Sequence, residues 1–231
     1  KPRDAGGKAT RRITALEELR IEQVWNTVVE SRTFAGLRVL TLPSAGSGLI
    51  TSLAKSPALP SLTELTIHAK SSDGMSQASF RQLFATDKLA RLRRFDIRRV
   101  PFATVIVVGL WAKWFAGLEE LRLRSVGFNA AAAQALAHLP AKNLRLLDLH
   151  WNPLDDDSLR LLLTAPALQN LQELNLSSCD LTDESARALA EWEGLRTVRR
   201  LDLTGNEIGA AEARVIKSSP NAVNLTDLQM F

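Results

Sequence analysis

A short apolar motif recurs nine times along the chain at nearly constant spacing. Each copy has an apolar residue, a second one three positions later and a third after two more; the copies begin at residues 16, 37, 62, 92, 118, 144, 171, 198 and 225. Side chains alternate between the two faces of an extended strand, so the second and third apolar residues share one face. Strands repeated every 21 to 30 residues predict an architecture in which each unit buries its apolar face against its neighbours.

Segments with helical character follow several of these strands. Three aspartates open the segment 155–163 and precede leucines at helical spacing, and Thr182 with two acidic residues opens the segment 182–190. Acceptor side chains and negative charge favour the start of a helix, because the first backbone N–H groups of a helix have no partner within it. Each repeat is therefore expected to combine a strand with a helix.

The motif extends into a longer pattern in the C-terminal half. Residues 144–154 and 171–181 match L-x-x-L-x-L-x-x-N/C-x-L in full, and residues 198–208 match it nearly. In this pattern the chain resembles leucine-rich repeat proteins, and its repeats of 26–27 residues with helices resemble the ribonuclease-inhibitor-like subclass. The resemblance implies a right-handed α/β solenoid, a leucine-rich-repeat horseshoe with about nine parallel strands on its concave face and helices on its convex face. It covers residues 16–231, in about eight to nine repeats, after a basic tail over residues 1–15.

The resemblance also implies a structural role for Asn152, Cys179 and Asn206. These side chains should turn inward and bond the loop backbone of neighbouring repeats, as a structural ladder. Cys179 is the only cysteine, so an intrachain disulfide is excluded. A single cysteine fits a reducing compartment, and we expect a cytoplasmic protein of bacterial type.

The basic character of the chain comes from its first residues. Residues 1–12 hold five basic residues and one acidic residue, which accounts for the whole formal charge of +4. A neutral remainder weakens the case for nucleic acid as a partner. Apolar runs stay shorter than the roughly 18 residues of a membrane span. The chain begins with Lys1 and no signal-peptide core, so we expect a fragment or a processed product.

Four positions of each repeat are expected to project from the concave face: the second, fourth, sixth and seventh after its first apolar residue. In the middle repeats these positions are rich in arginine, histidine and tryptophan: His68, Arg94, Arg98, Arg99, Arg122, Arg124, His150 and Trp151. Tryptophan and arginine are enriched at interface hot spots, so the pattern predicts a binding surface for an acidic protein segment. The alternative is that the arginines pair with acidic residues of neighbouring strands, such as Asp96, Glu120 and Asp148.

A second candidate surface lies in residues 101–115. Other repeats have polar or small residues where this one has Val105 and Val108, and Trp111 and Trp114 follow. An exposed apolar patch marks a contact site, so this segment is a candidate surface for self-association. The alternative is an irregular segment packed on its neighbours, because β-branched residues have poor helix propensity.

The patterns of common catalytic and cofactor sites are missing from the sequence. No glycine-rich phosphate loop carries its lysine, and the three histidines are too scattered to gather around a metal ion. We therefore expect no catalytic residue, no cofactor and no metal, but a protein-interaction module that forms the recognition part of a larger protein. The alternatives are a binder of polyanions or nucleic acid, through the concave arginines and the basic tail, and a self-associating scaffold.

Overall fold

One parallel sheet runs through the whole molecule. The structure is a computed structural model and describes residues 18–20, 35–69, 76–100, 112–138 and 141–230. Its sheet has nine strands in sequential order. They are β1 (Glu18–Arg20), β2 (Val39–Ala45), β3 (Glu64–Ala69), β4 (Arg94–Arg98), β5 (Glu120–Arg124), β6 (Leu146–Asp148), β7 (Glu173–Asn175), β8 (Arg200–Asp202) and β9 (Asp227–Gln229). Every strand begins two residues after the start of a motif copy, so the nine strands expected from the sequence are confirmed.

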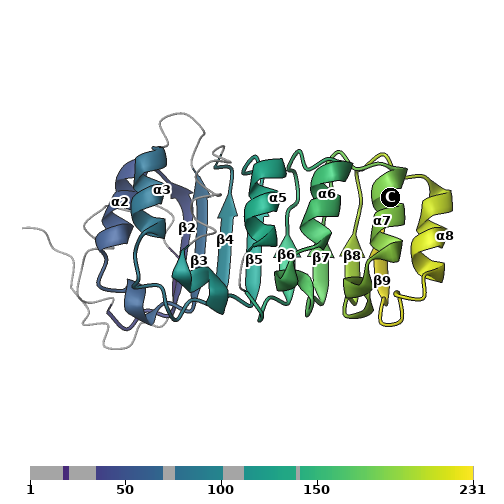
Figure 1. Ribbon diagram of the computed structural model, residues 1–231. Helices are drawn as coiled ribbons and strands as arrows, with labels where there is room; N and C mark the ends of the chain where they lie inside the picture. Colours follow the sequence, from purple (N-terminus) through teal and green to yellow (C-terminus); the bar gives the residue numbers. More distant parts are fainter. Residues whose placement is uncertain (1–17, 21–34, 70–75, 101–111, 139–140, 231) are drawn as a thin grey trace, which may run out of the picture.

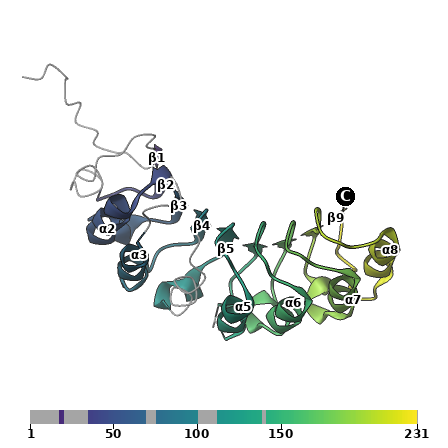
Figure 2. The ribbon, with the colours of Figure 1, turned by 90° about the horizontal axis from the view of Figure 1, so that it is seen from above.

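Helices cover one face of this sheet. The α-helices are α2 (Ser47–Lys55), α3 (Gln77–Phe84), α5 (Ala130–Ala137), α6 (Asp156–Leu163), α7 (Asp183–Glu191) and α8 (Ala210–Ser218). Short 3₁₀ helices are η2 (Leu59–Ser61), η3 (Lys113–Gly117), η4 (Pro166–Leu168) and η5 (Glu193–Arg196). Figure 1 shows the strands in a row with the helices over them, and Figure 2 shows an arc with the strands on its inner side. The expected right-handed α/β solenoid is confirmed.

Side chains at the helix starts satisfy free backbone N–H groups. The Asp155 carboxylate accepts a hydrogen bond from the Ser158 N–H at 2.8 Å, and the Thr182 hydroxyl accepts one from the Glu184 N–H at 3.3 Å. A capping side chain of this kind stabilises a helix by about 1 kcal/mol. The segments 155–163 and 182–190 are therefore helical where their acidic residues predicted it.

The core lies between the sheet and the helices. The strand register places one apolar side chain of each repeat beside that of the next: Leu65, Phe95, Leu121, Leu147, Leu174 and Leu201. All of these side chains are buried. Because burial of a leucine side chain contributes about 1.5–3 kcal/mol, each repeat is stabilised mainly through its contact with two neighbours.

Aromatic residues fill the core where the repeats are least regular. Trp114 and Phe115 of η3 pack against Phe84 and Phe95, with ring centroids 5.4 to 6.3 Å apart. The Trp114 side chain is 4% exposed, and its Nε1–H donates to the Phe84 carbonyl oxygen at 3.3 Å. Trp114 therefore offers no free surface for self-association, because its ring is part of the core.

The other three residues of that candidate convex surface are not described by the structure. Val105, Val108 and Trp111 lie in the segment 101–111, outside the described residues.

An inward-pointing asparagine joins two repeats at each of two loops. The Asn152 Oδ1 accepts hydrogen bonds from the N–H groups of Val126 and Phe128, and its Nδ2 donates to the carbonyl oxygens of Leu123 and Leu149. Asn206 makes the same four kinds of contact to its own and the preceding repeat. These side chains replace the regular strand pairing that ends before the loop, so the backbone groups there stay paired in the interior.

Cys179 occupies the equivalent loop between those two asparagines. Its thiol donates to the Leu149 carbonyl oxygen at 3.2 Å. Burial raises the pKa of Cys179 to about 12. The residue is a neutral thiol at physiological pH and not a nucleophile.

Candidate binding face on the concave sheet

The concave arginines and histidines lie next to one another, as the repeat spacing predicts. The strand register places His68 beside Arg98, and Arg98 beside Arg124. His150 continues this row after β6, because its carbonyl oxygen accepts the N–H of Ser125 at 3.0 Å.

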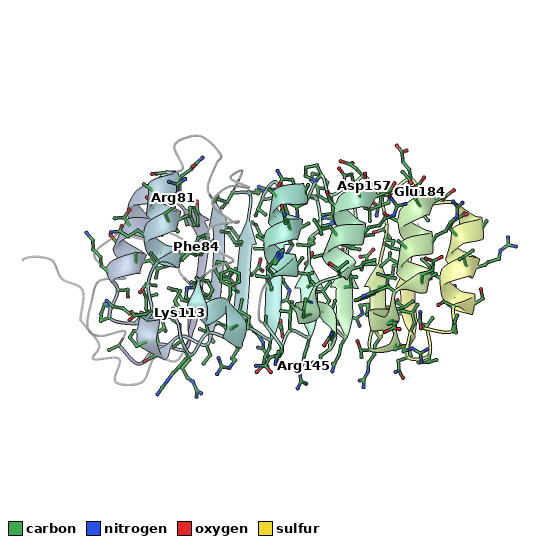
Figure 3. All side chains as sticks on the ribbon, viewed as in Figure 1. Arg81, Phe84, Lys113, Arg145, Asp157 and Glu184 are labelled. Carbon is green, nitrogen blue, oxygen red and sulfur yellow. The ribbon has the colours of Figure 1, made fainter. Side chains whose placement is uncertain are left out.

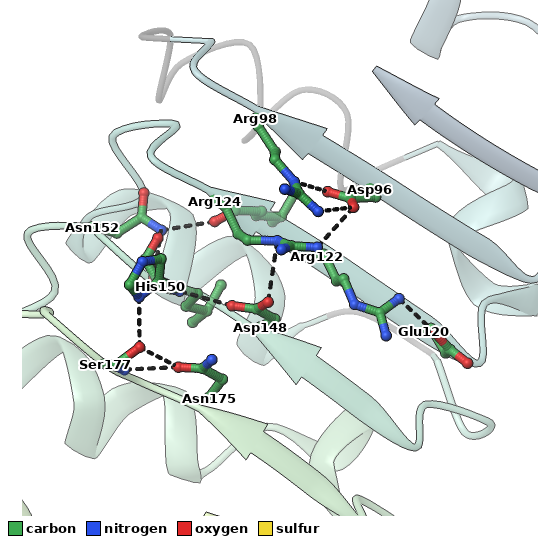
Figure 4. A network of polar contacts seen from close by, with 12 residues as sticks. Asp96, Arg98, Glu120, Arg122, Arg124, Asp148, His150, Asn152, Asn175 and Ser177 are labelled. Atoms are coloured by element: carbon green, nitrogen blue, oxygen red, sulfur yellow. Dashed lines mark hydrogen bonds and ion pairs between the residues drawn. The ribbon is translucent and has the colours of Figure 1, made fainter. Parts of the chain in front are cut away.

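The arginines of this row are neutralised within the protein. Asp96 accepts two hydrogen bonds from Arg98, at 3.0 and 3.2 Å, and one from Arg124, at 2.7 Å. The Arg124 Nε lies 3.1 Å from a carboxylate oxygen of Asp148. Figure 4 shows these four side chains as one alternating chain of charges. Both aspartates are less than a tenth exposed, so the ion pairs are shielded from water better than an ordinary surface pair.

A second alternating chain crosses the same strands nearer their starts. Arg94 contacts Glu64 at 2.6 Å and Glu120 at 2.9 Å, and Arg122 contacts Glu120 at 2.6 Å. In the two rows of ion pairs together, four arginines thus face four carboxylates. Arg94 and Arg124 pair across strands, as this alternative predicts, whereas Arg98 and Arg122 pair with Asp96 and Glu120 of their own strands.

His68 adds no positive charge to this surface near neutral pH. Burial, with a smaller contribution from the charge of Arg98, lowers its pKa from the usual value of 6.5. A neutral ring beside Arg98 removes one of the cations that a polyanion could have used.

The residue four positions after the first apolar residue of a repeat stabilises the turn that follows the strand. Asp148 accepts the N–H of His150 at 3.1 Å, and Asn175 accepts the N–H of Ser177 at 2.9 Å. Asp202 accepts the N–H of Thr204 at 3.0 Å in the same way. Their role in the concave row is therefore largely structural.

His150 is held in a defined orientation by the next repeat. Its Nδ1 lies 2.5 Å from the Ser177 Oγ, and this hydroxyl donates its one proton to the Asn175 Oδ1 at 2.6 Å. The serine oxygen can then only accept from His150, so Nδ1 is the donor of this pair. A catalytic histidine would instead take the proton of the serine, which makes this histidine–serine pair unsuited to nucleophilic catalysis.

The seventh position carries an unusual backbone conformation in five consecutive repeats. Its residues all have positive φ: Arg99 at 57°, Ser125 at 52°, Trp151 at 60°, Ser178 at 52° and Gly205 at 69°. A left-handed conformation costs a residue with a side chain roughly 1–2 kcal/mol relative to the right-handed one. The sequence pattern gave no sign of this strain except for the glycine at 205.

Trp151 is the large apolar residue of this row, and it is exposed to solvent. The side chain is 62% exposed, and its ring centroid lies 5.7 Å from that of His150. Both the left-handed backbone of Trp151 and the solvent exposure of its apolar ring lower the stability of the folded protein. Such outliers concentrate at functional sites. The structure thus places Trp151 at the carboxyl edge of β6 with an oriented histidine beside it, and the exposed Arg99 two repeats before it.

A shallow concave cleft begins beside β6, and sequence reasoning missed it. Its volume is about 180 Å³, and its lining includes Arg122, Leu146, Asp148, Glu173, Arg200 and Asp202. Leu146 is half-buried and stands in register between Glu120 and Glu173, so it interrupts a row of charged residues. The signal in the sequence was this single apolar residue at the second position of its repeat.

The described residues contain no cluster of three or more histidine, cysteine, aspartate or glutamate side chains arranged to hold a metal ion. Of the helices in the described ranges, none is long and apolar enough to cross a membrane.

Comparison with known proteins identifies the repeats. A family model described as Leucine Rich repeat matches residues 167–190 and 194–211. No curated protein matches the chain.

Solved structures with a similar fold share little sequence with the chain. An internalin from Listeria monocytogenes is 14% identical, with a TM-score of 0.46, over 85% of this chain and 62% of its own. The TLR13–ssRNA13 complex gives 19% identity and a TM-score of 0.43, over 86% of this chain and 36% of that one. An LRR protein from Leptospira interrogans gives 18% and 0.45, over 86% and 50%. The chain thus spans less than two thirds of the length of each of these proteins.

Proposed function

We propose that the chain is a non-catalytic protein-binding module that holds a partner on its concave face around Trp151. The observation that carries the proposal is the 62% exposure of this side chain on a backbone with φ of 60°. Tryptophan is among the residues that contribute most to binding when a partner covers them. The cleft beside Leu146 and the exposed Arg99 extend the proposed surface on either side of it.

The paired arginines support a protein partner over a polyanion. Nucleic acids are held mainly by cations that replace counterions on the phosphates. Arg98 and Arg124 share Asp96, so much of their positive charge is already neutralised within the protein. A folded protein with its own mixed charges can extend the two alternating chains without breaking them, which gives register and specificity more than raw affinity.

The proposal also includes the subclass of the repeats and the cellular location of the protein. Repeats of 26–27 residues with convex α-helices favour the ribonuclease-inhibitor-like subclass, and the buried thiol of Cys179 is compatible with a reducing, cytoplasmic location. Self-association is the weaker candidate, because Trp114 is buried in the core.

Variants at one position test this function. A partner captured from the source cell would be identified and its dissociation constant measured by calorimetry with the wild type, Trp151→Ala and Trp151→Gly. We expect both substitutions to weaken binding about thirtyfold, as truncation of a hot-spot side chain costs about 2 kcal/mol. Trp151→Gly suits the positive φ and guards against a loss caused by misfolding.

A matched control uses an exposed apolar residue away from the concave face. Val223 is 66% exposed, and Val223→Ala is expected to leave the dissociation constant unchanged. A partner that binds the two Trp151 variants as tightly as the wild type would refute the proposed site.

A further inference from the structure

A polar groove lies at the opposite edge of the sheet from Trp151. It runs past the amino-terminal ends of β6, β7, β8 and β9 and has a volume of about 410 Å³. Its lining residues are Lys142, Asn143, Arg145, Asn170, Gln172, Thr197, Arg199 and Asn224. Figure 3 shows Arg145 at this lower edge of the molecule, away from the concave network of Figure 4.

The groove is positively charged and holds no carboxylate. Lys142, Arg145 and Arg199 are exposed, and none of them forms an ion pair with any described residue. Of the concave arginines, by contrast, Arg94, Arg98, Arg122 and Arg124 each have a carboxylate partner. Arg93 occupies the same position of an earlier repeat, and there Glu119 lies 3.9 Å from it. Arg145 and Arg199 thus differ from Arg93 in having no carboxylate within ion-pair distance among the described residues.

Side-chain amides supply the rest of the lining. Asn170 donates to the Lys142 carbonyl oxygen at 3.1 Å, and Asn224 donates to the Arg196 carbonyl oxygen at 2.6 Å. These bonds fix both amides and leave their Oδ1 atoms as acceptors. Gln172, in the middle of the groove, makes no side-chain hydrogen bond within the described ranges. An amide can both donate and accept, which is what the backbone of an extended peptide requires of a binding groove.

We propose that this groove binds an extended acidic segment of a protein, with carboxylates seated on Arg145 and Arg199. The two arginines occupy the same position two strands apart, which corresponds to about 9.6 Å at the usual strand spacing. A polyproline II segment advances about 9.3 Å in three residues and returns its side chain to the same side. Acidic residues at positions i and i+3 of such a segment match the spacing of the two arginines.

The surroundings of the groove favour a peptide over a nucleic acid. Arg200, adjacent to Arg199, is already paired with Glu173 at 3.3 Å and Asp227 at 3.0 Å. On the side of the strands, the positive area therefore ends at Arg200. A phosphate backbone needs a longer track of cations, whereas two bidentate arginines are enough to orient two carboxylates.

Fluorescence anisotropy with a defined probe tests the assignment. The probe is a short fluorescein-labelled proline-rich peptide with two glutamates three positions apart, at low ionic strength. We expect Arg145→Gln and Arg199→Gln each to weaken its binding about tenfold, since a charge-assisted hydrogen bond contributes about 1.5 kcal/mol. Arg38→Gln is the matched control, because Arg38 is exposed at the same repeat position but does not line the groove. Trp151→Ala is expected to leave probe binding unchanged, so this site and the concave site can fail independently.

Three results would overturn the assignment. The first is equal binding of a peptide in which both glutamates are replaced by glutamine. The second is a loss in Arg38→Gln as large as the loss in Arg145→Gln. The third is a single-stranded oligonucleotide that binds more tightly than the peptide and depends on the same two arginines, which would make the groove a phosphate site. Circular dichroism of each variant checks that the solenoid is folded.

Discussion

Replacement of Asn152 by alanine is expected to destabilise the solenoid far more than any surface change. Its side chain is 2% exposed and spans two repeats. Asn152→Ala leaves the N–H groups of Val126 and Phe128 without an acceptor and removes the donor to two carbonyl oxygens. A buried donor without a partner costs about 1–3 kcal/mol, so the two N–H groups together give a loss of about 4 kcal/mol.

Asn206 provides the internal comparison. It makes the same four kinds of bond but is partly exposed, so water can reach the groups that Asn206→Ala would leave unpaired. A loss of about 2 kcal/mol is expected there, because partial hydration offsets part of the desolvation penalty. Asn152→Cys should fall between alanine and the wild type, since Cys179 fills the equivalent loop.

Urea unfolding followed by circular dichroism measures these differences, with the free energies extrapolated linearly to water. The reasoning requires the order Asn152→Ala, then Asn152→Cys, then wild type, and a smaller effect at position 206 than at position 152. A loss below about 1 kcal/mol for Asn152→Ala would show that the loop pairs its backbone in some other way.

Two further predictions concern ionisation. Burial raises the pKa of Cys179 to about 12, so iodoacetamide at pH 8 should label the native protein very slowly and the urea-unfolded protein quickly; equal rates would contradict the buried thiol. Burial of Asp156 opposes its ionisation, but hydrogen bonds from Ser185 and Thr182 outweigh it and lower the pKa from 3.8. Its contribution to stability is therefore full above pH 3.8 and is lost as the pH falls through the folded-state pKa, so Asp156→Asn should destabilise at pH 7 and approach the wild type in acid. A difference in unfolding free energy that stays constant from pH 7 to pH 2 would refute this role.

The repeating backbone was predictable because it depends on one-dimensional spacing. The apolar residues three and five positions after the start of each motif copy determine which face of the strand is turned to the core. The start of the strand follows from the same spacing. Asp155 and Thr182 mark helix starts through bonds made within the same few residues. Features that depend on residues close together in the sequence, such as these strands and helix starts, can be predicted without knowledge of the fold.

The sequence predicted which residues lie on the concave surface, but not whether their charges are paired within the protein. The sequence placed Arg98, Arg124 and Asp96 on one face, yet whether Arg124 is free for a partner or paired within the protein depends on its distances to Asp96 and Asp148, which are 28 and 24 positions away. The burial of Trp114 likewise follows from contacts with Phe84, thirty residues earlier. The positive φ at Trp151 comes from the loop geometry that five consecutive repeats share, and no residue type other than Gly205 indicated it.

The row of left-handed residues has a consequence for how the surface can change. Arg99, Ser125, Trp151, Ser178 and Gly205 differ widely in size and charge, yet the backbone beneath them is the same. Their side chains are not part of the buried core, so a change at Arg99, Ser125 or Trp151 does not require repacking of the leucines. Gly205 is the exception, because an added Cβ would lie 2.7 Å from the Ser178 Oγ. The exposed side chains of this row can therefore differ from repeat to repeat while the scaffold stays constant.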